Sequence, residues 1–226
     1  MRLEPLADDA WLIHLGATAE AATNAQVHAL AARIRAQSPM WLRDLVPAYA
    51  SLGVFFDTDA ITADAAQDWL RAQYHADTGS AAMPDSRLVE IPVAYGNRFG
   101  EDFDSVAAEL DITSVELIAR HSTAIYTVAM IGFAPGFPYL SGLDPSLALP
   151  RLATPRTRVP AGSVAIGGAQ TGIYPRESPG GWRLIGCTPL RLFDPQRASP
   201  SLLAPGDRVR FVAINDGAFA RLECDA

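Results

Sequence analysis

The stretch from residue 131 to 189 constrains the fold more than any other part of the chain. It holds most of the glycines and more than half of the prolines. Glycine permits backbone conformations that are closed to other residues, whereas proline fixes φ and removes a hydrogen-bond donor. Aromatic residues and arginines lie between them: Phe133, Phe137, Tyr139, Tyr174, Trp182, Arg151, Arg156, Arg158 and Arg176. Short apolar runs (SVAIG, WRLIG) interrupt the stretch, so we predict shaped loops between short strands, where binding residues usually lie, rather than a disordered segment.

The first 85 residues predict a small α+β sandwich. Alternating and extended patterns indicate strands at residues 11–16, 41–46 and 48–56. Thr18 is placed to cap a helix whose apolar face comprises Val27, Leu30, Ala31 and Ile34. Thr62 is placed to cap a second helix. The small, polar segment at residues 76–85 is typical of an interdomain linker.

Residues 86–226 predict a second domain rich in short strands. Its first strand, residues 87–95, contains Pro92, which indicates an edge strand or a bulge. A short helix is expected at residues 102–110, and Thr113 with Glu116 forms the capping-box pattern of a second helix. Further strands are predicted at residues 124–131, 163–166, 172–174, 182–187, 190–193 and 208–214. Many short strands separated by Gly/Pro turns are typical of a β-barrel or sandwich, so the fold class is α+β.

Composition excludes several functions. The formal net charge is −7, which argues against nucleic acid or an anionic membrane as partner. All 18 basic residues are arginine, so a Walker A lysine and a Schiff-base lysine are excluded. No metal-ligand spacing joins the four histidines or the two cysteines, so we expect no metal and two reduced thiols. The sequence has no long apolar run and no apolar leader, which predicts a cytoplasmic protein.

The glycine-rich segment from residue 162 to 172 has two interpretations. Its backbone N–H groups suit an anion-binding nest, with polar support from Gln170. The alternative is a set of tight β-turns, which the spacing alone favours because neither GxxxxGK[ST] nor GxGxxG is present. The residues of this nest are Gly162, Gly167, Gly168 and Gly172, with Gln170 and Thr171.

Two further residues are catalytic candidates. His121 lies where a predicted helix ends, a position that favours a cationic imidazole; the functional alternative is a proton carrier near neutral pH. Arg156 lies in TPRTRVP, and its proline flanks suit a rigid clamp on a carboxylate or phosphate. The alternative for Arg156 is an ordinary solvated arginine. No GxSxG elbow supports a serine hydrolase, and Tyr174 and Trp182 are more often core or groove walls than catalytic groups.

Several segments together resemble one protein family. They are IPVAYGNRFGEDFDSVA, ELDITSVELIARHS, MIGFAPGFPYLSGLD, TPRTRVPAGSVAIGGAQTGIYP and SPGGWRLIGCTP. The family is that of the 5-oxoprolinase B subunit, also described as KipI-like or as allophanate hydrolase subunit one. The match runs from about residue 88 to 194 and is nearly gapless.

The resemblance implies a small α/β domain followed by a cyclophilin-like β-barrel. It also implies a cytoplasmic enzyme in which this chain, with the C and A subunits of 5-oxoprolinase, opens the lactam of 5-oxoproline to glutamate. ATP with Mg²⁺ would act at the level of the complex, with no cofactor held tightly by this chain, which would be inactive alone. In that context Arg156 is expected to bind an anion, and His121 to transfer a proton or donate a hydrogen bond. The substrate- or phosphate-binding residues are expected to be Gly162, Ser163, Gly167, Gly168, Gln170 and Tyr174. Gln170 and the glycine amides would be polar anchors. The alternative implied by the KipI branch is a non-catalytic inhibitor of a sensor histidine kinase.

Overall fold

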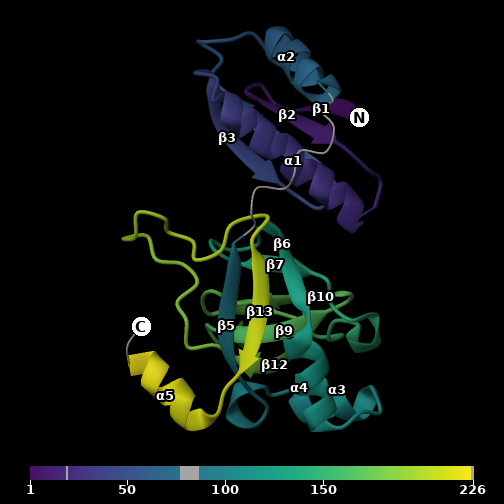
Figure 1. Ribbon diagram of the computed structural model, residues 1–226, viewed down its shortest axis with the longest axis vertical. Helices are drawn as coiled ribbons and strands as arrows, with labels where there is room; N and C mark the ends of the chain where they lie inside the picture. Colours follow the sequence, from purple (N-terminus) through teal and green to yellow (C-terminus); the bar gives the residue numbers. More distant parts are fainter. Residues whose placement is uncertain (19, 77–86, 225–226) are drawn as a thin grey trace. The chain divides into compact units, whose positions relative to one another are not determined.

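The computed structural model describes residues 1–18, 20–76 and 87–224 (Figure 1). The chain divides into two compact units, Met1–Ser86 and Arg87–Ala226, and each is described by itself. The linker predicted at residues 76–85 lies, apart from Ala76, outside the described residues. Within the described part of the chain, every helix is too short or too polar to cross a bilayer.

The first unit is a four-stranded antiparallel sheet packed against two helices. Its strands are β1 (Arg2–Ala7), β2 (Ala10–His14), β3 (Leu42–Pro47) and β4 (Ser51–Phe56), in the order β1-β2-β4-β3. The helices are α1 (Ala21–Gln37) and α2 (Ala63–His75). The face predicted for α1 is buried against the sheet, with Val27 and Ile34 fully inaccessible to solvent. This confirms the predicted face of α1 and adds β1, an exposed edge strand that its sequence pattern does not reveal.

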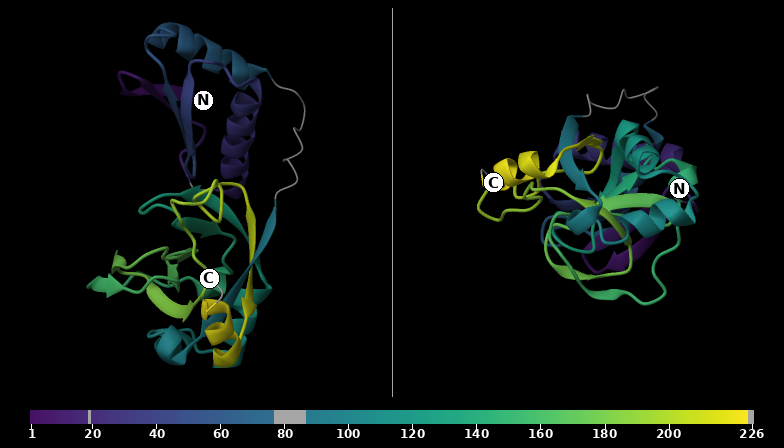
Figure 2. Two further views of the ribbon diagram at one scale, coloured as in Figure 1. Left: turned by 90° about the vertical axis from the view of Figure 1, so that its left-hand side faces the viewer. Right: turned by 90° about the horizontal axis from the view of Figure 1, so that it is seen from below.

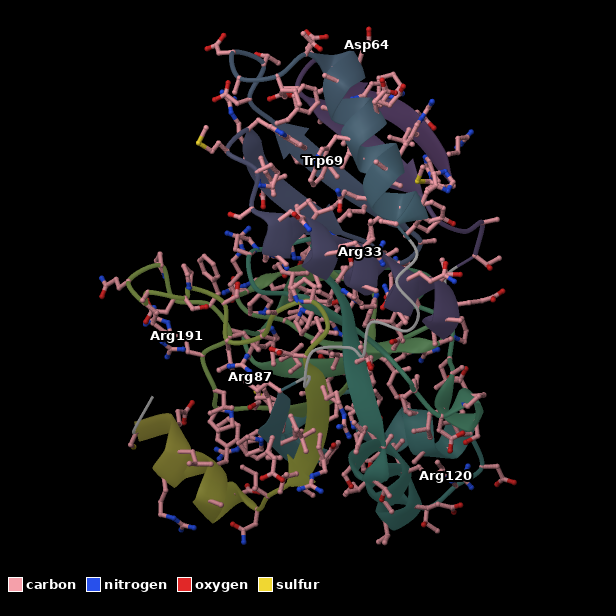
Figure 3. All side chains as sticks on the ribbon, turned by 45° about the horizontal axis from the view of Figure 1, so that its top comes forward. Arg33, Asp64, Trp69, Arg87, Arg120 and Arg191 are labelled. Carbon is pink, nitrogen blue, oxygen red and sulfur yellow. The ribbon has the colours of Figure 1, made fainter. Side chains whose placement is uncertain are left out.

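Helix capping in this unit agrees with the prediction at one of two positions. The Thr62 side chain accepts a hydrogen bond from the Ala65 backbone N–H (3.3 Å), as expected of an N-cap. Thr18 is not a cap, because α1 begins at Ala21 and its N-cap is Glu20. The Thr18 hydroxyl instead donates to the Glu20 carboxylate (2.8 Å). In the same unit, the ring of Trp69 on α2 (Figure 3) meets the Trp41 ring edge-on, with centroids 5.0 Å apart.

The second unit is built on a closed barrel of seven strands in the order β10-β7-β6-β13-β5-β12-β9. The strands are β5 (Leu88–Tyr95), β6 (Ile125–Ile131), β7 (Pro138–Ser141), β9 (Ser163–Gly167), β10 (Gln170–Ile173), β12 (Arg183–Cys187) and β13 (Arg208–Ala213). Outside the barrel, β8 (Arg156–Val159) and β11 (Ser178–Gly180) form a two-stranded sheet. The predicted α+β class and barrel are therefore confirmed, whereas the specific likeness to cyclophilin stays a prediction.

Closure of the barrel corrects the prediction for Pro92. Strands β5 and β13 run parallel and side by side (Figures 1 and 2), and their register is unbroken from Arg208 opposite Leu88 to Ala213 opposite Val93. β5 is thus not an edge strand of an open sheet, and Pro92 does not lie in a bulge. It is tolerated because β12, the other neighbour of β5, pairs only with Ala94 and Tyr95.

Helices cover parts of the barrel. The role of Glu116 and the structure of residues 190–193 differ from the prediction. The helices are α3 (Phe103–Glu109), α4 (Ser114–Thr123) and α5 (Asp216–Cys224), with short 3₁₀ turns at Asn97–Phe99 and Pro145–Leu147. Thr113 caps α4 as predicted, accepting from the Glu116 N–H (3.1 Å), but the Glu116 carboxylate binds Arg120. The strand predicted at residues 190–193 is wrong. Only Phe193 makes a β-bridge there, opposite Ser201.

Candidate functional site

A small pocket lies on the outside of the barrel unit and is lined mainly by aromatic side chains. We call it the aromatic pocket; its side chains come from Phe133, Phe137, Tyr139, Arg151, Tyr174 and Trp182. Its volume is about 100 Å³. The rings meet edge to face, with centroids 5.2 Å apart for Phe137 and Tyr174 and 5.7 Å apart for Phe137 and Trp182. Such edge-to-face contacts are the favoured geometry for aromatic rings and hold these walls in place.

Glycines at fixed positions allow the walls to approach the backbone. A Cβ at Gly180 would lie 2.3 Å from the Tyr174 hydroxyl oxygen, and one at Gly167 would lie 2.4 Å from the Trp182 ring. A side chain at either position would therefore displace a wall of the pocket. The Trp182 backbone also interacts with the Tyr174 hydroxyl and partly offsets the rise that burial causes in the pKa of Tyr174. The glycine spacing of this region is explained by the packing of two aromatic rings.

Phe133 has a strained backbone and an exposed side chain. Its φ is +66°, and the Ala134 N–H donates to the Gly132 carbonyl (2.7 Å) across it. A hydrogen bond between residues i and i+2 around a positive φ defines the rare, strained form of the γ-turn. The Phe133 side chain is nonetheless 59% exposed, at the mouth of the pocket. Strain of this kind costs of the order of 1–3 kcal/mol and is concentrated at functional sites.

Arg151 supplies positive charge at the rim. Its guanidinium carbon lies 5.6 Å from the centroid of the Trp182 ring, in a cation–π contact. Backbone hydrogen bonds pin the segment on either side, from Gly168 N–H to Leu149 O (2.8 Å) and from Leu152 N–H to Gly181 O (2.7 Å). Among residues 1–18, 20–76 and 87–224 no carboxylate forms an ion pair with Arg151. Its charge thus faces solvent at the pocket.

Arg156, a predicted clamp, is held by protein carboxylates. It forms ion pairs with Asp102 (2.7 Å) and Glu101 (3.2 Å), and the Asp102 carboxylate also accepts from the Leu184 backbone N–H (2.7 Å). The remaining guanidinium nitrogen, Nη1, is buried and has no hydrogen-bond partner in the described part of the chain. The same holds for Oγ of Ser178, on the strand paired with that of Arg156. Buried polar atoms without partners are rare in folded proteins.

His121 lies in the sealed interior of the barrel unit, fully inaccessible to solvent. A carbonyl can only accept, so the Thr171 hydroxyl donates its one proton to the Ala165 carbonyl (3.0 Å). The Thr171 oxygen must then accept from Nε2–H of His121 (3.0 Å), and Nδ1 accepts from the Tyr95 hydroxyl (2.8 Å). Burial lowers the pKa of His121 from 6.5 to about 3.

The imidazole is therefore neutral, and the expectation of a cation at the helix end is wrong. Its ring also stacks on Phe211, with centroids 4.5 Å apart. Both nitrogens are used inside the protein, so the geometry favours a hydrogen-bonding role that joins α4 to β5 and β10. Proton transfer by His121 stays a prediction.

The glycine-rich segment is a β-hairpin. Gln170 lies opposite Gly167, which leaves Gly168 and Ala169 as a two-residue turn between β9 and β10. Gly168 has φ +64° and Ala169 does not have a positive φ, the pattern of a type II′ turn. The N–H groups of Gly162 and Gly168 are already bonded to Tyr174 O (2.7 Å) and Leu149 O (2.8 Å). The phosphate nest thus gains no support from the geometry.

The remaining predicted residues do not line one common pocket. Ser163 is buried at the start of β9, Gln170 is half-buried at the start of β10, and Gly162 borders a groove of about 300 Å³ beside α5. Arg191 borders that groove too (Figure 3), as does Cys187. Burial raises the pKa of the Cys187 thiol to about 11, which makes it a poor nucleophile. Among the residues that the structure describes, no group of three or more His, Cys, Asp or Glu side chains is placed to hold a metal ion.

Of the predicted residues, only Tyr174 lines the aromatic pocket. Sequence reasoning missed Arg151 and Phe133 as site residues, although both belong to the aromatic and arginine-rich pattern of residues 131–189. Tyr174 and Trp182 are groove walls, which is one of the two ordinary roles expected of them. The high density of aromatic residues in this Gly/Pro-rich stretch is the sequence feature that could have identified them.

Comparisons with known proteins agree over most of the chain. Residues 1–203 match the family described as carboxyltransferase domain, subdomain C and D. A protein from Bacillus subtilis (strain 168), named as the B subunit of 5-oxoprolinase, is 40% identical over 225 residues, 95% of this chain and 93% of that protein. One of the same name from Haemophilus influenzae is 57% identical over 126 residues, 56% of this chain and 59% of its own. The crystal structure of TTHA0988 has a TM-score of 0.78 at 38% identity, covering 92% of this chain and 40% of that chain.

Proposed function

The chain belongs to the 5-oxoprolinase B subunit family, and we propose that it is the B subunit of an ATP-dependent 5-oxoprolinase. The enzyme hydrolyses 5-oxo-L-proline to L-glutamate together with the C and A subunits. The observation that carries the proposal is 40% identity to a protein of that name over nearly the whole of both chains. Because the relatives are named as enzyme subunits, they favour this function over inhibition of a histidine kinase.

The chemistry requires activation of a stable amide. Resonance makes the lactam carbonyl unreactive, and ATP with Mg²⁺ would supply a leaving group on its oxygen. In this chain the glycine hairpin does not fit a phosphate cradle, since the N–H groups of Gly162 and Gly168 are bonded to backbone carbonyls. No lysine is present anywhere in the sequence. We therefore place nucleotide binding on a partner subunit, with this chain inactive alone.

The partner-facing surface is proposed to include the β8–β11 sheet, which lies outside the barrel and carries the exposed ion pair of Arg158 and Glu177. We further propose a cytoplasmic complex, because its co-substrate ATP is available there.

Reconstitution tests the function. Purified chain is mixed with the tagged C subunit and with the A subunit from the same organism, and co-purification and glutamate release are measured. We expect glutamate only when all three subunits, ATP, Mg²⁺ and 5-oxo-L-proline are present. Binding to the C subunit without any ATP-dependent glutamate release would refute the proposed activity. Binding to a sensor histidine kinase in place of the C subunit would support the inhibitor instead.

A further inference from the structure

We infer that the aromatic pocket binds the 5-oxo-L-proline ring, with Arg151 pairing its carboxylate and the Tyr174 hydroxyl donating to its lactam carbonyl. This inference rests on the proposed function and adds the site and the roles of its residues. Three properties of the pocket carry it: its size, the charge at its mouth and the polar group at its floor.

The size of the pocket selects a small ring. Its volume is about 100 Å³, whereas an apolar cavity of roughly 150 Å³ holds one benzene molecule. The pocket therefore suits one small ring, and any charged substituent would project from its mouth. The walls of Phe137 and Trp182 present ring faces and edges to such a ligand, and apolar C–H groups pack well against them.

The charge at the mouth selects an anion. Arg151 is exposed and lies against the Trp182 ring at 5.6 Å. Its planar guanidinium matches a carboxylate in two parallel hydrogen bonds. The paired hydrogen bonds around residues 149 and 152 hold the Arg151 backbone in place, which lowers the entropy lost on binding.

One polar group lines the pocket itself. The Tyr174 hydroxyl lies beside the Trp182 backbone, and as a phenol it carries a proton to donate. Burial raises the pKa of Tyr174, so the hydroxyl keeps that proton at neutral pH. A lactam oxygen that accepts from it is oriented toward the pocket floor. Phe133, held over the mouth by its strained turn, covers the other side of the ring.

The same features discriminate against the product. Glutamate carries an ammonium group and a second carboxylate in place of the neutral lactam. To bury either charge among aromatic walls without a partner is costly. Ring opening therefore weakens binding and favours release.

Two measurements test the inference on the full-length chain. The four tryptophans give four indole N–H signals, and three of them, Trp11, Trp41 and Trp69, belong to the first unit. With ¹⁵N-tryptophan label, Trp182→Phe identifies the signal of Trp182. We expect only that signal to shift on addition of 5-oxo-L-proline or of 2-pyrrolidinone, which lacks the carboxylate. L-glutamate should not shift it.

The variant Arg151→Gln then tests the contribution of the Arg151 charge to binding of the ligand carboxylate. We expect at least a tenfold weaker response to 5-oxo-L-proline and less than a twofold change for 2-pyrrolidinone, with partial recovery in Arg151→Lys. Arg98→Gln is the matched control, because Arg98 is also an exposed arginine in a cation–π contact, 4.7 Å from the Phe99 centroid. In the reconstituted enzyme, Arg151→Gln should raise KM for 5-oxo-L-proline at least tenfold and leave KM for ATP unchanged.

The two proposals fail separately. If the wild-type complex is active but Arg151→Gln leaves KM for 5-oxo-L-proline unchanged, the pocket assignment is overturned and the function stands. If the complex is inactive, the titration with 5-oxo-L-proline tests the pocket assignment by itself. A shift of the Trp182 signal that depends on Arg151 supports the assignment, and a signal that does not shift overturns it.

Discussion

The barrel interior and the aromatic pocket place similar chemical groups in opposite situations. In the interior, Tyr95, His121 and Thr171 form a chain of hydrogen bonds that ends on the Ala165 carbonyl and leaves no polar atom of the His121 ring unused. At the pocket, Arg151 and Phe133 are exposed, and the Phe133 backbone is strained. The first arrangement stabilises the fold, whereas the second is suited to receive a ligand.

Neither the residue type nor its presence in a family motif therefore tells whether a residue stabilises the fold or binds a ligand. His121 and Tyr174 both lie in segments that resemble the family. The structure distinguishes them: both ring nitrogens of His121 have hydrogen-bond partners within the protein, whereas Tyr174 lines a pocket. Four measurements on variants and on the wild type test this contrast.

The largest change should be the loss of stability in His121→Ala. Loss of the imidazole leaves a cavity and removes hydrogen-bond partners from Tyr95 and Thr171, both of which use it. We expect a loss of about 3–5 kcal/mol in the free energy of unfolding, measured by urea denaturation. His75→Ala, at an exposed histidine, is the control and should change it by less than about 0.5 kcal/mol. A His121→Ala protein of normal stability that has lost activity would assign His121 to the reaction instead.

Two arginines on β8 provide the second test. Arg156 is 19% exposed and binds Asp102, which is 10% exposed, whereas Arg158 is 76% exposed in its pair with Glu177. Removing one partner of a largely buried pair leaves an uncompensated charge, so Arg156→Gln should lower the free energy of unfolding by about 2 kcal/mol. Arg158→Gln should change it by less than about 0.5 kcal/mol. Unchanged stability of Arg156→Gln, together with lost glutamate release, would instead identify Arg156 as the predicted anion clamp.

The third prediction concerns how the stability contributed by the buried His121 depends on pH. The pKa of His121 is about 3 in the folded protein and 6.5 in the unfolded chain. Between these values the unfolded state binds more protons, so His121 contributes stability above pH 6.5 that is lost as pH falls toward 3. The expected loss is about 1.4 kcal/mol per pH unit, or about 2 kcal/mol at pH 5. Urea denaturation from pH 5 to 8 should show this slope below pH 6.5 in the wild type and a smaller one in His121→Gln. Equal slopes would mean that the imidazole titrates normally.

The sequence predicts those helix ends that are fixed by contacts between residues close together in the chain. Thr62 and Thr113 are predictable as caps because a side-chain acceptor directly precedes an amphipathic run. The prediction for Thr18 is wrong because α1 starts later than its pattern suggests, with Glu20 as its N-cap. Strand β1 escapes prediction because its residues are almost all exposed and include Pro5. Such an edge strand has no alternation of buried and exposed positions to detect.

The site depends on pairing over long distances, which periodicity does not contain. Strand β10 pairs with β7 as well as with β9, and this closes the barrel over His121 and turns Tyr174 toward the pocket. Arg151 lies in a segment without regular structure, placed by single hydrogen bonds to Gly168 and Gly181. The family resemblance indicates which stretch matters, but the division into interior and pocket follows only from the three-dimensional pairing.

The smallest change should come from the glycine hairpin, and it tests whether this turn belongs to the fold or to an anion site. A Cβ at Gly168 would meet nothing within 4 Å, but the residue has φ +64°, so Gly168→Ala should cost about 1 kcal/mol through backbone strain alone. Gly167→Ala, one residue earlier, should cost more because its Cβ would lie 2.4 Å from the Trp182 ring. In the reconstituted enzyme Gly168→Ala should leave KM for ATP unchanged, since the Gly168 N–H is bonded to Leu149. A KM for ATP raised tenfold, without a loss of stability, would show instead that this turn binds phosphate and that the outer face of the barrel carries a second ligand site beside the aromatic pocket.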